Sequence, residues 1–221
     1  MARLVLTAAE RDAVTAAVAA AEAGSDGEIV TIVAARSDAY HDVALHYAVL
    51  ALLAMTAIGA IWPGIFTPFD RGWEAADLSR DLLALLIAQA LAFLIVRVLL
   101  AWRPLRMALT PRATKARRVR RRAVELFRVG TESRTAGREG VLLYLSTDEH
   151  GAEIVTDAAV HRLVPPERWG EAMAALVVAV RDGRAGDGMV AAVSAIGAIL
   201  ADYLPKTSDN PNELPDRVIE L

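Results

Sequence analysis

Two long apolar stretches dominate the pattern of hydrophobic and polar positions along the chain. They cover Val43–Ile61 and Leu82–Trp102, and Gln89 and Arg97 interrupt the second one. A membrane-spanning helix needs roughly 20 mainly apolar residues at about 1.5 Å each, and both stretches have that length. Buried helices of a soluble core are the alternative, but such helices usually carry a polar face, which the first stretch lacks. The pattern therefore predicts a transmembrane helical hairpin over residues 43–102.

The rest of the chain alternates between predicted strands and amphipathic helices. Strands are predicted at Glu28–Ala35, Gly140–Ser146 and Ala152–Thr156, which are rich in β-branched and apolar residues and are bounded by turns. The last two strands are separated by a tight turn and should form a β-hairpin. Helical spacing of apolar residues predicts helices after the capping box at Thr7, over 113–129 and 158–163, after Pro165, and over 189–204, with a break at 183–188.

These elements predict an α/β fold, a three-layer α/β/α sandwich around a small mixed sheet, with the helical hairpin inserted after the first strand. That strand is too apolar to be covered by a single helix, and the two later strands lack a central partner. We therefore expect residues 1–42 and 103–205 to form one split domain, joined through the hairpin at 43–102. Residues 206–221 are polar and contain proline, so they are predicted to be an irregular tail.

The distribution of charge predicts the orientation of the hairpin. Nine basic residues and no acidic ones lie between Arg103 and Arg122, whereas the loop Phe66–Asp81 is net acidic. Because an excess of Lys and Arg marks the cytoplasmic side of a membrane, both termini are predicted to be cytoplasmic. Arg97 lies five residues before Trp102, close enough for its guanidinium to reach the inner headgroups. A transport role for Arg97 is the alternative.

Acidic side chains supply the best candidate for a metal site. Glu28 begins a predicted strand, Asp148 and Glu149 lie in the hairpin turn, and Asp157 follows the last strand. If these carboxylates gather at one edge of the sheet, their oxygens suit Ca²⁺ or Mg²⁺. The alternative is that they are ordinary turn and cap residues, with Asp157 at the N-cap of the next helix. The chain contains no cysteine, which excludes disulfides and zinc sites built on thiolates.

A run of arginines in the helix predicted over 113–129 is a second candidate for binding. Its members are Arg117, Arg118, Arg120, Arg121 and Arg122. Because the run follows a predicted span, anionic lipid headgroups are the expected ligand, and nucleic acid is the alternative that we do not expect. The hydroxyl and arginine side chains of the polar loop 131–138 suggest either phosphate handling or an ordinary solvated loop.

Several ordered segments carry a resemblance to a known family. They are Thr7–Glu10, Asp26–Val30, Phe127, Arg134–Thr135, Gly140–Ser146, Glu149, Glu153–Val155, Asp157, Trp169 and Asn212–Asp216. With these segments the chain resembles the TPM-domain family, named partly for a thylakoid-lumen protein of photosystem II repair, and in particular its bacterial membrane-anchored branch. The resemblance implies an α/β/α sandwich anchored in the bacterial inner (cytoplasmic) membrane. Some members of the family are described as acid phosphatases or metal-binding domains.

The residues and the resemblance leave two functions open. The first is a non-catalytic, membrane-anchored interaction or envelope-maintenance module, with membrane lipids and an unidentified protein as partners. The second is a weak metal-dependent acid phosphatase-like hydrolase. The chain lacks the paired aspartates that phosphatase-like members carry near the first strand, and a hairpin is inserted in its domain. Both departures favour the first function.

Overall fold

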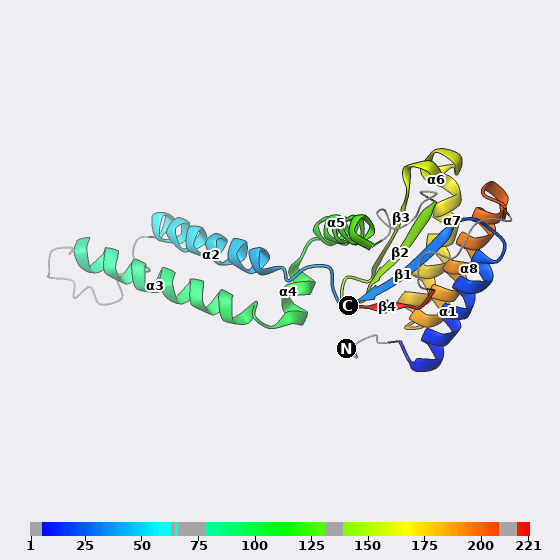
Figure 1. The fold of residues 1–221 in the computed structure, drawn as a ribbon. Coiled ribbons are helices and arrows are strands. Elements are labelled where there is room, and N and C mark those ends of the chain that lie inside the picture. The colour runs from blue at the N-terminus through cyan, green and yellow to red at the C-terminus, as the bar shows by residue number, and fades with distance from the viewer. Residues whose placement is uncertain (1–5, 63–64, 66–77, 131–138, 208–215) are drawn as a thin grey trace. The chain divides into compact units, whose positions relative to one another are not determined.

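The computed structural model of the 221-residue chain describes residues 6–62, 65, 78–130, 139–207 and 216–221. The chain forms two compact units (Figure 1). The first, which we call the α/β unit, consists of Met1–Asp38 and Arg112–Leu221. The second, the hairpin unit, consists of Ala39–Pro111.

A four-stranded mixed sheet organises the α/β unit. In spatial order β3-β2-β1-β4, its strands are Gly151–Thr156 (β3), Gly140–Ser146 (β2), Glu28–Ala34 (β1) and Ile219–Glu220 (β4). β1 runs parallel to β2 and to β4, and β3 is antiparallel to β2. Because β1 and β2 lie on opposite sides of the hairpin in the sequence, the predicted pairing across the insertion is confirmed. The predicted β2–β3 hairpin is confirmed as well.

Helices cover both faces of this sheet and give the predicted three layers (Figure 1). α5 (Arg112–Gly130) packs on one face through three buried side chains, Val119, Ala123 and Phe127. The other face is covered by α1 (Ala8–Glu22), α7 (Pro166–Arg181) and α8 (Ala185–Tyr203). The short helix α6 (Ala158–Leu163) has the predicted bounds and connects β3 to α7.

The side chains of β1 show why both faces must be covered. All seven residues of the strand are buried. Ile29 and Val33 belong to the cluster with α1, α7 and α8, whereas Val30 and Ile32 pack with the side chains of α5. Successive side chains of a strand point to opposite faces, so a continuously apolar strand needs a layer on each side.

The start of α8 differs from the sequence prediction. A break is predicted at 183–188, whereas α8 begins at Ala185. The turn before it is made by Gly183, which has a positive φ of 79°. A Cβ added at Gly188 would lie 2.8 Å from the Cβ of Ala179 on α7, so this glycine permits close packing of α7 and α8. The glycines at 183 and 188 predict the break, but Gly188 lies within α8 and serves its packing against α7.

The end of the chain also differs from its prediction. Residues 206–221 are predicted to be irregular, but the last residues form β4 beside β1. The backbone N–H of Leu221 donates to the carbonyl of Val33 over 3.0 Å, and the N–H of Ala35 donates to the carbonyl of Leu221 over 3.1 Å. Pairing with a distant strand, which the local sequence does not encode, gives this segment its structure. Residues 208–215 of the tail lie outside the described part of the chain.

The hairpin unit contains the two predicted apolar helices. α2 (His41–Ile61) and α3 (Leu78–Leu99) lie side by side, and both are long and apolar enough to cross a membrane (Figure 1). The Nε2 of Gln89 donates to the Oγ1 of Thr56 over 2.6 Å, so one N–H of the amide that interrupts the second apolar stretch is paired within the hairpin. Most of the predicted acidic loop, residues 66–77, lies outside the described residues.

A short helix that the sequence does not predict follows in the same unit. α4 (Arg103–Leu109) carries Pro104 in its first turn, where the missing N–H of proline costs nothing. The hydroxyl of Tyr47 on α2 donates to the carbonyl of Leu109 over 3.0 Å. This hydrogen bond joins the end of α4 to the start of the hairpin.

Candidate functional site

A buried polar cluster lies at the carboxyl ends of β1 and β2. Tyr144 belongs to the core beneath α5, and Ser146, two residues on, shares its face of β2. Glu149, in the turn that follows, accepts hydrogen bonds from the Oγ of Ser146 and, over 2.9 Å, from the backbone N–H of Ser37. The Oγ of Ser37 lies 3.1 Å from the Tyr144 hydroxyl. The turn after β2 thereby holds the segment that follows β1.

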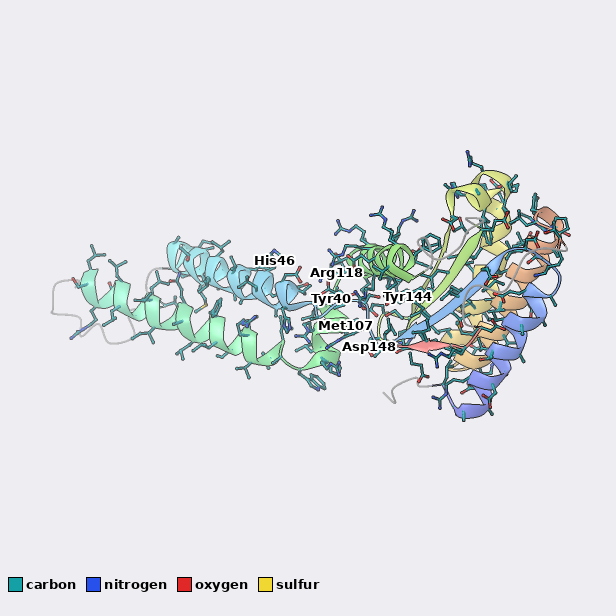
Figure 2. All side chains as sticks on the ribbon, in the orientation of Figure 1. Tyr40, His46, Met107, Arg118, Tyr144 and Asp148 are labelled. Carbon is teal, nitrogen blue, oxygen red and sulfur yellow. The ribbon has the colours of Figure 1, made fainter. Side chains whose placement is uncertain are left out.

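Asp38 ties the same segment to α5. Its Oδ2 lies 3.0 Å from the Nη1 of Arg118 and 2.9 Å from the Nη2 of Arg121. The side chains of Arg118 and Asp38 retain only 15% and 23% of their exposure, so solvent screens this pair less than an ordinary surface ion pair. Figure 2 labels Arg118 and Tyr144, which both lie at this end of the sheet. The residues that lead from β1 to the hairpin are therefore fixed to both β2 and α5.

This arrangement suits a structural role better than a reaction. Ligands often bind at the carboxyl ends of parallel strands, and the cluster offers hydroxyl, carboxylate and guanidinium groups. However, Tyr144 and Ser146 are fully buried, so a substrate does not reach them in this structure. Burial also raises the pKa of the Tyr144 phenol, which keeps the group neutral. We interpret the cluster as a clamp that holds the chain where it leaves the sheet for the hairpin.

The four acidic residues predicted to form a metal site lie at two ends of the sheet. Glu28 opens β1 and pairs with Gly140, the first residue of β2. Asp148 and Glu149 instead follow the last residue of β2. Since a strand rises about 3.3 Å per residue, the two groups are about 20 Å apart along the sheet. The expectation that all four gather at one edge is therefore wrong, because parallel pairing places Glu28 at the amino end of β2.

Asp157 lies near Glu28 but supports the strands. The backbone N–H of Gly140 donates to the Oδ2 of Asp157 over 3.1 Å, and the N–H of Asp157 donates to the carbonyl of Gly140 over 3.0 Å. Asp157 occupies the N-cap position of α6, in agreement with the alternative interpretation of this residue, but its side chain makes no capping hydrogen bond. Across the described ranges, no three His, Cys, Asp or Glu side chains are grouped to hold a metal ion. The predicted ligands of Ca²⁺ or Mg²⁺ therefore do not fit one shared ion.

A buried carboxyl group that the sequence analysis missed lies at the amino end of β1. Glu22 ends α1, is 7% exposed, and accepts a hydrogen bond from the N–H of Ile29 over 2.7 Å. Burial raises the pKa of Glu22 to about 7; the hydrogen bond from Ile29 opposes this shift and the charge of Glu28 adds to it. Val14, Val18 and Glu22 are spaced at i, i+4 and i+8, which places Glu22 on the buried face of α1. This spacing is the feature of the sequence from which the burial of Glu22 could have been predicted.

The arginines predicted to bind lipid all lie on α5, and four of the five form ion pairs within the α/β unit. Two of them share Asp38, as described above. The Nη1 of Arg120 lies 3.9 Å from the Oε2 of Glu153 on β3, and the Nη1 of Arg122 lies 3.5 Å from the Oε2 of Glu125 on α5 itself. Burial raises the pKa of Glu153, and the nearby Arg120 opposes that shift. Carboxylates of the same unit therefore partly neutralise four of the five arginines in the run.

Arg117 differs from its neighbours on α5. Its Nη2 donates to the Oγ1 of Thr114 over 3.4 Å, and within the described ranges it forms no ion pair with a carboxylate. The polar loop at 131–138, considered for phosphate handling, lies outside the described residues.

Comparison with known proteins agrees with the resemblance over part of the chain. A family model described as the TPM domain matches residues 105–199. This segment matches the TPM-domain family. It runs from α4 to α8 and includes β2 and β3, whereas α1 and β1 precede it. No curated protein matches the chain.

The fold of the chain is also similar to a solved structure. The NMR structure of the BA42 protein from the psychrophilic bacterium Bizionia argentinensis aligns with a TM-score of 0.57 and 18% sequence identity. The alignment covers 98% of this chain and 95% of the BA42 chain. At this identity the similarity concerns the fold, and it agrees with the mixed α/β architecture around the TPM segment.

Proposed function

We propose that this protein is a membrane-anchored TPM-like module that acts through interaction or envelope maintenance rather than through catalysis. The exposed apolar surface of α2 and α3 carries the proposal. In the most apolar window of α3 no residue is buried inside the structure, and in that of α2 only 11% are. Trp62 and Trp102, near the ends of the helices, are each 65% exposed, as is typical of aromatic side chains at a membrane surface.

Water is an unfavourable environment for these helices. Their exposed apolar side chains include Leu50, Leu53, Leu83, Leu86, Ile87, Leu91, Leu94 and Ile95. Removing one such side chain from water contributes about 1.5–3 kcal/mol, and soluble monomers rarely expose so large an apolar surface. A bilayer removes this surface from water, and helices satisfy their own backbone polar groups inside it. Anchoring therefore explains the surface without a further partner.

The proposed location is the bacterial inner (cytoplasmic) membrane, with both termini in the cytoplasm. The basic residues between Arg103 and Arg122 favour that side, and a two-helix hairpin returns the chain to the side from which it entered. This topology lets β1 and β2 meet in one sheet. Reporter fusions should place the loop around Gly72 outside and Leu221 inside. An exported C-terminus would contradict the proposed orientation.

Extraction of membranes tests the anchoring itself. The full chain is expressed in a bacterium, and isolated membranes are washed with alkaline carbonate, which releases peripheral proteins. We expect the chain to stay in the membrane pellet and to leave it only in detergent. Release by carbonate alone would show that α2 and α3 do not span the bilayer.

A weak metal-dependent acid phosphatase-like activity is the second candidate function. The match of residues 105–199 to the TPM domain supports it, whereas the separation of Glu28 from Asp148 and Glu149 removes the expected ligand set. The purified full chain is incubated with a generic phosphate ester, with and without Ca²⁺ or Mg²⁺. We expect no hydrolysis above that of a heat-denatured sample. Metal-stimulated hydrolysis that a Glu28→Gln or Glu149→Gln variant loses would favour the enzyme.

A further inference from the structure

α5 carries more positive charge than its surroundings neutralise. The helix contains eight basic residues and one acidic residue, Glu125. Four of the eight form the ion pairs described above. The remaining four form no ion pair with any carboxylate in the described part of the chain; they are Arg112, Lys115, Arg117 and Arg128. An excess of charge therefore stays available on the surface of α5.

Three of the basic residues share the face of α5 that points away from the sheet. Val119 and Ala123 define the buried face. At about 100° per residue, the side chains of Arg117, Arg121 and Arg128 then lie on the opposite face. The Arg121 side chain is 64% exposed although it pairs with Asp38 over 2.9 Å and with Glu125 over 3.7 Å, and Arg117 and Arg128 are exposed as well. These three side chains lie along one side of the helix and form a row, which we call the outer arginine stripe.

We propose that the outer arginine stripe, Arg117, Arg121 and Arg128, binds the headgroups of anionic phospholipids. The proposal rests on the membrane anchoring proposed above. α5 begins thirteen residues after α3 ends, a chain length that spans at most about 45 Å and less where α4 is helical. The tether keeps the stripe at a high effective concentration near the bilayer. Planar guanidinium groups match the phosphate oxygens of headgroups.

The structure changes which residues are assigned to lipid binding. Arg118 is excluded because its side chain is only 15% exposed and lies 3.0 Å from Asp38. Arg120 points toward Glu153 at the side of β3 and lies off the outer face. Arg128 joins the set, although the run in the sequence ends six residues earlier. Arg122, beside Glu125, lies at the margin of the stripe.

A single fluorescent label can test the proposal, because the chain has no cysteine of its own. Val129 is 77% exposed beside the stripe, so a Val129→Cys variant accepts an environment-sensitive dye. The full chain is placed in nanodiscs of phosphatidylcholine alone or mixed with phosphatidylglycerol. In the mixed discs we expect a blue-shifted emission and slower quenching by a water-soluble quencher. Both effects should disappear at high salt, which screens exposed charges.

Matched variants separate the stripe from general charge. In an Arg117→Gln/Arg121→Gln/Arg128→Gln variant the two kinds of disc should give the same emission, with the apparent affinity for phosphatidylglycerol falling roughly fivefold for each arginine replaced. The variant Arg162→Gln/Arg184→Gln/Arg217→Gln removes the same charge from other exposed positions and should behave like the parent. Unchanged circular dichroism of both variants shows that the α/β unit remains folded.

Three outcomes would overturn the proposal. The parent could show the same dye emission in the two kinds of disc. Alternatively, both triple variants could lose the emission difference between the discs to the same extent. The label could also be protected in neutral discs by an RNA oligonucleotide at physiological salt, which would assign the stripe to nucleic acid. A chain that does not enter discs at all contradicts the anchoring proposal instead, and the amount of chain per disc is measured first to distinguish this case.

Discussion

α3 and α8 are both long apolar helices, but they lie in different surroundings. Each is long and apolar enough to cross a membrane. In the most apolar window of α3 none of the residues is buried inside the structure, whereas in that of α8 56% are. α8 lies against the sheet in the layer that it shares with α1 and α7, and α3 packs on α2. Apolar composition alone therefore predicts that a helix is removed from water, but it does not predict whether the helix is buried in the protein interior or in lipid.

Close packing against neighbouring elements shows that α8 belongs to the protein interior. A Cβ added at Gly197 would lie 2.5 Å from the Cβ of Ala21 on α1, and one added at Gly27 would lie 2.9 Å from the Cδ1 of Leu200. Such fits exist only where two surfaces are complementary, and interiors are packed as densely as organic crystals. Among the described residues of the hairpin unit, the outward side chains of α3 meet no such surface, and in the proposed anchoring lipid surrounds them instead. The difference between these helices can be tested by substitution.

The largest effect is expected from removing a buried side chain in the last turn of α8. Leu200 is fully buried beneath the α1–β1 turn. A Leu200→Ala substitution should lower the free energy of unfolding of the α/β unit by about 2–5 kcal/mol, since it loses apolar burial and leaves a cavity. Urea unfolding of the full chain in detergent, followed by circular dichroism, measures this change. The matched Leu86→Ala substitution on α3, where the side chain is 60% exposed, should leave the unfolding midpoint unchanged.

An arginine introduced on an exposed side of each helix should have the opposite pattern of effects, harmful on α3 and harmless on α8. Leu91 is 54% exposed on α3, and arginine at the centre of a spanning helix costs roughly 3 kcal/mol of insertion. We expect Leu91→Arg to reduce the fraction of chain that resists carbonate extraction. The Ser194→Arg substitution, on the exposed side of α8, should change neither extraction nor folding. If Leu91→Arg were neutral, α3 would face water or a polar partner rather than lipid.

Much of this fold could be predicted from local patterns. β2 has the bounds expected from its continuous apolar run, and the capping box at Thr7 starts α1 as predicted. The hairpin helices follow from length and composition. The start of α8 and the strand β4 could not be predicted, because each depends on a distant surface. In α8 that surface is Ala179 beside Gly188, and in β4 it is the open edge of β1.

The candidate site was less predictable because it depends on strand register. The sequence predicts Glu149 to be a metal ligand, yet its carboxylate accepts a hydrogen bond from the backbone N–H of Ser37, a residue 112 positions away. Asp38 was not selected, although it joins the end of β1 to two arginines of α5. Residue types at turns indicate that polar groups are present. Only the pairing of β1 with β2 determines which of these groups meet.

The two units can also be compared through a polar side chain in each of them, and in the α/β unit this side chain is the buried carboxyl group of Glu22. Its pKa is raised from an ordinary value of 4.5 to about 7, so the folded state holds the proton more tightly than the unfolded state does. The folded state is then most favoured below pH 4.5, and stability is lost as the pH rises from there to about 7. A Glu22→Gln variant, which keeps an acceptor for the N–H of Ile29, should avoid this loss.

The expected gain for Glu22→Gln is about 1–2 kcal/mol at pH 8, below the full value of the pKa shift because burying the amide of glutamine also costs free energy. Melting curves of the full chain in detergent, recorded at pH 5 and pH 8, measure the gain. The difference between variant and parent should shrink toward pH 5, where Glu22 is already protonated in the folded state. A constant difference at both values would mean that proton binding is not responsible.

The smallest effect is expected from the polar contact inside the hairpin. Gln89 donates to Thr56 over 2.6 Å, and the Thr56 hydroxyl donates to the carbonyl of Leu52 over 3.0 Å. Despite the apolar surroundings, side-chain hydrogen bonds between membrane helices contribute only about 0.6 kcal/mol on average, because the separated helices also find partners. A double-mutant cycle with Gln89→Leu and Thr56→Val, read from thermal unfolding in detergent, should give a coupling energy of that size. The combined variant should still be retained in membranes, since both substitutions make the hairpin more apolar. A coupling energy several times larger would indicate that protein rather than lipid surrounds this contact, and α3 would then resemble α8 more closely than its exposed side chains indicate.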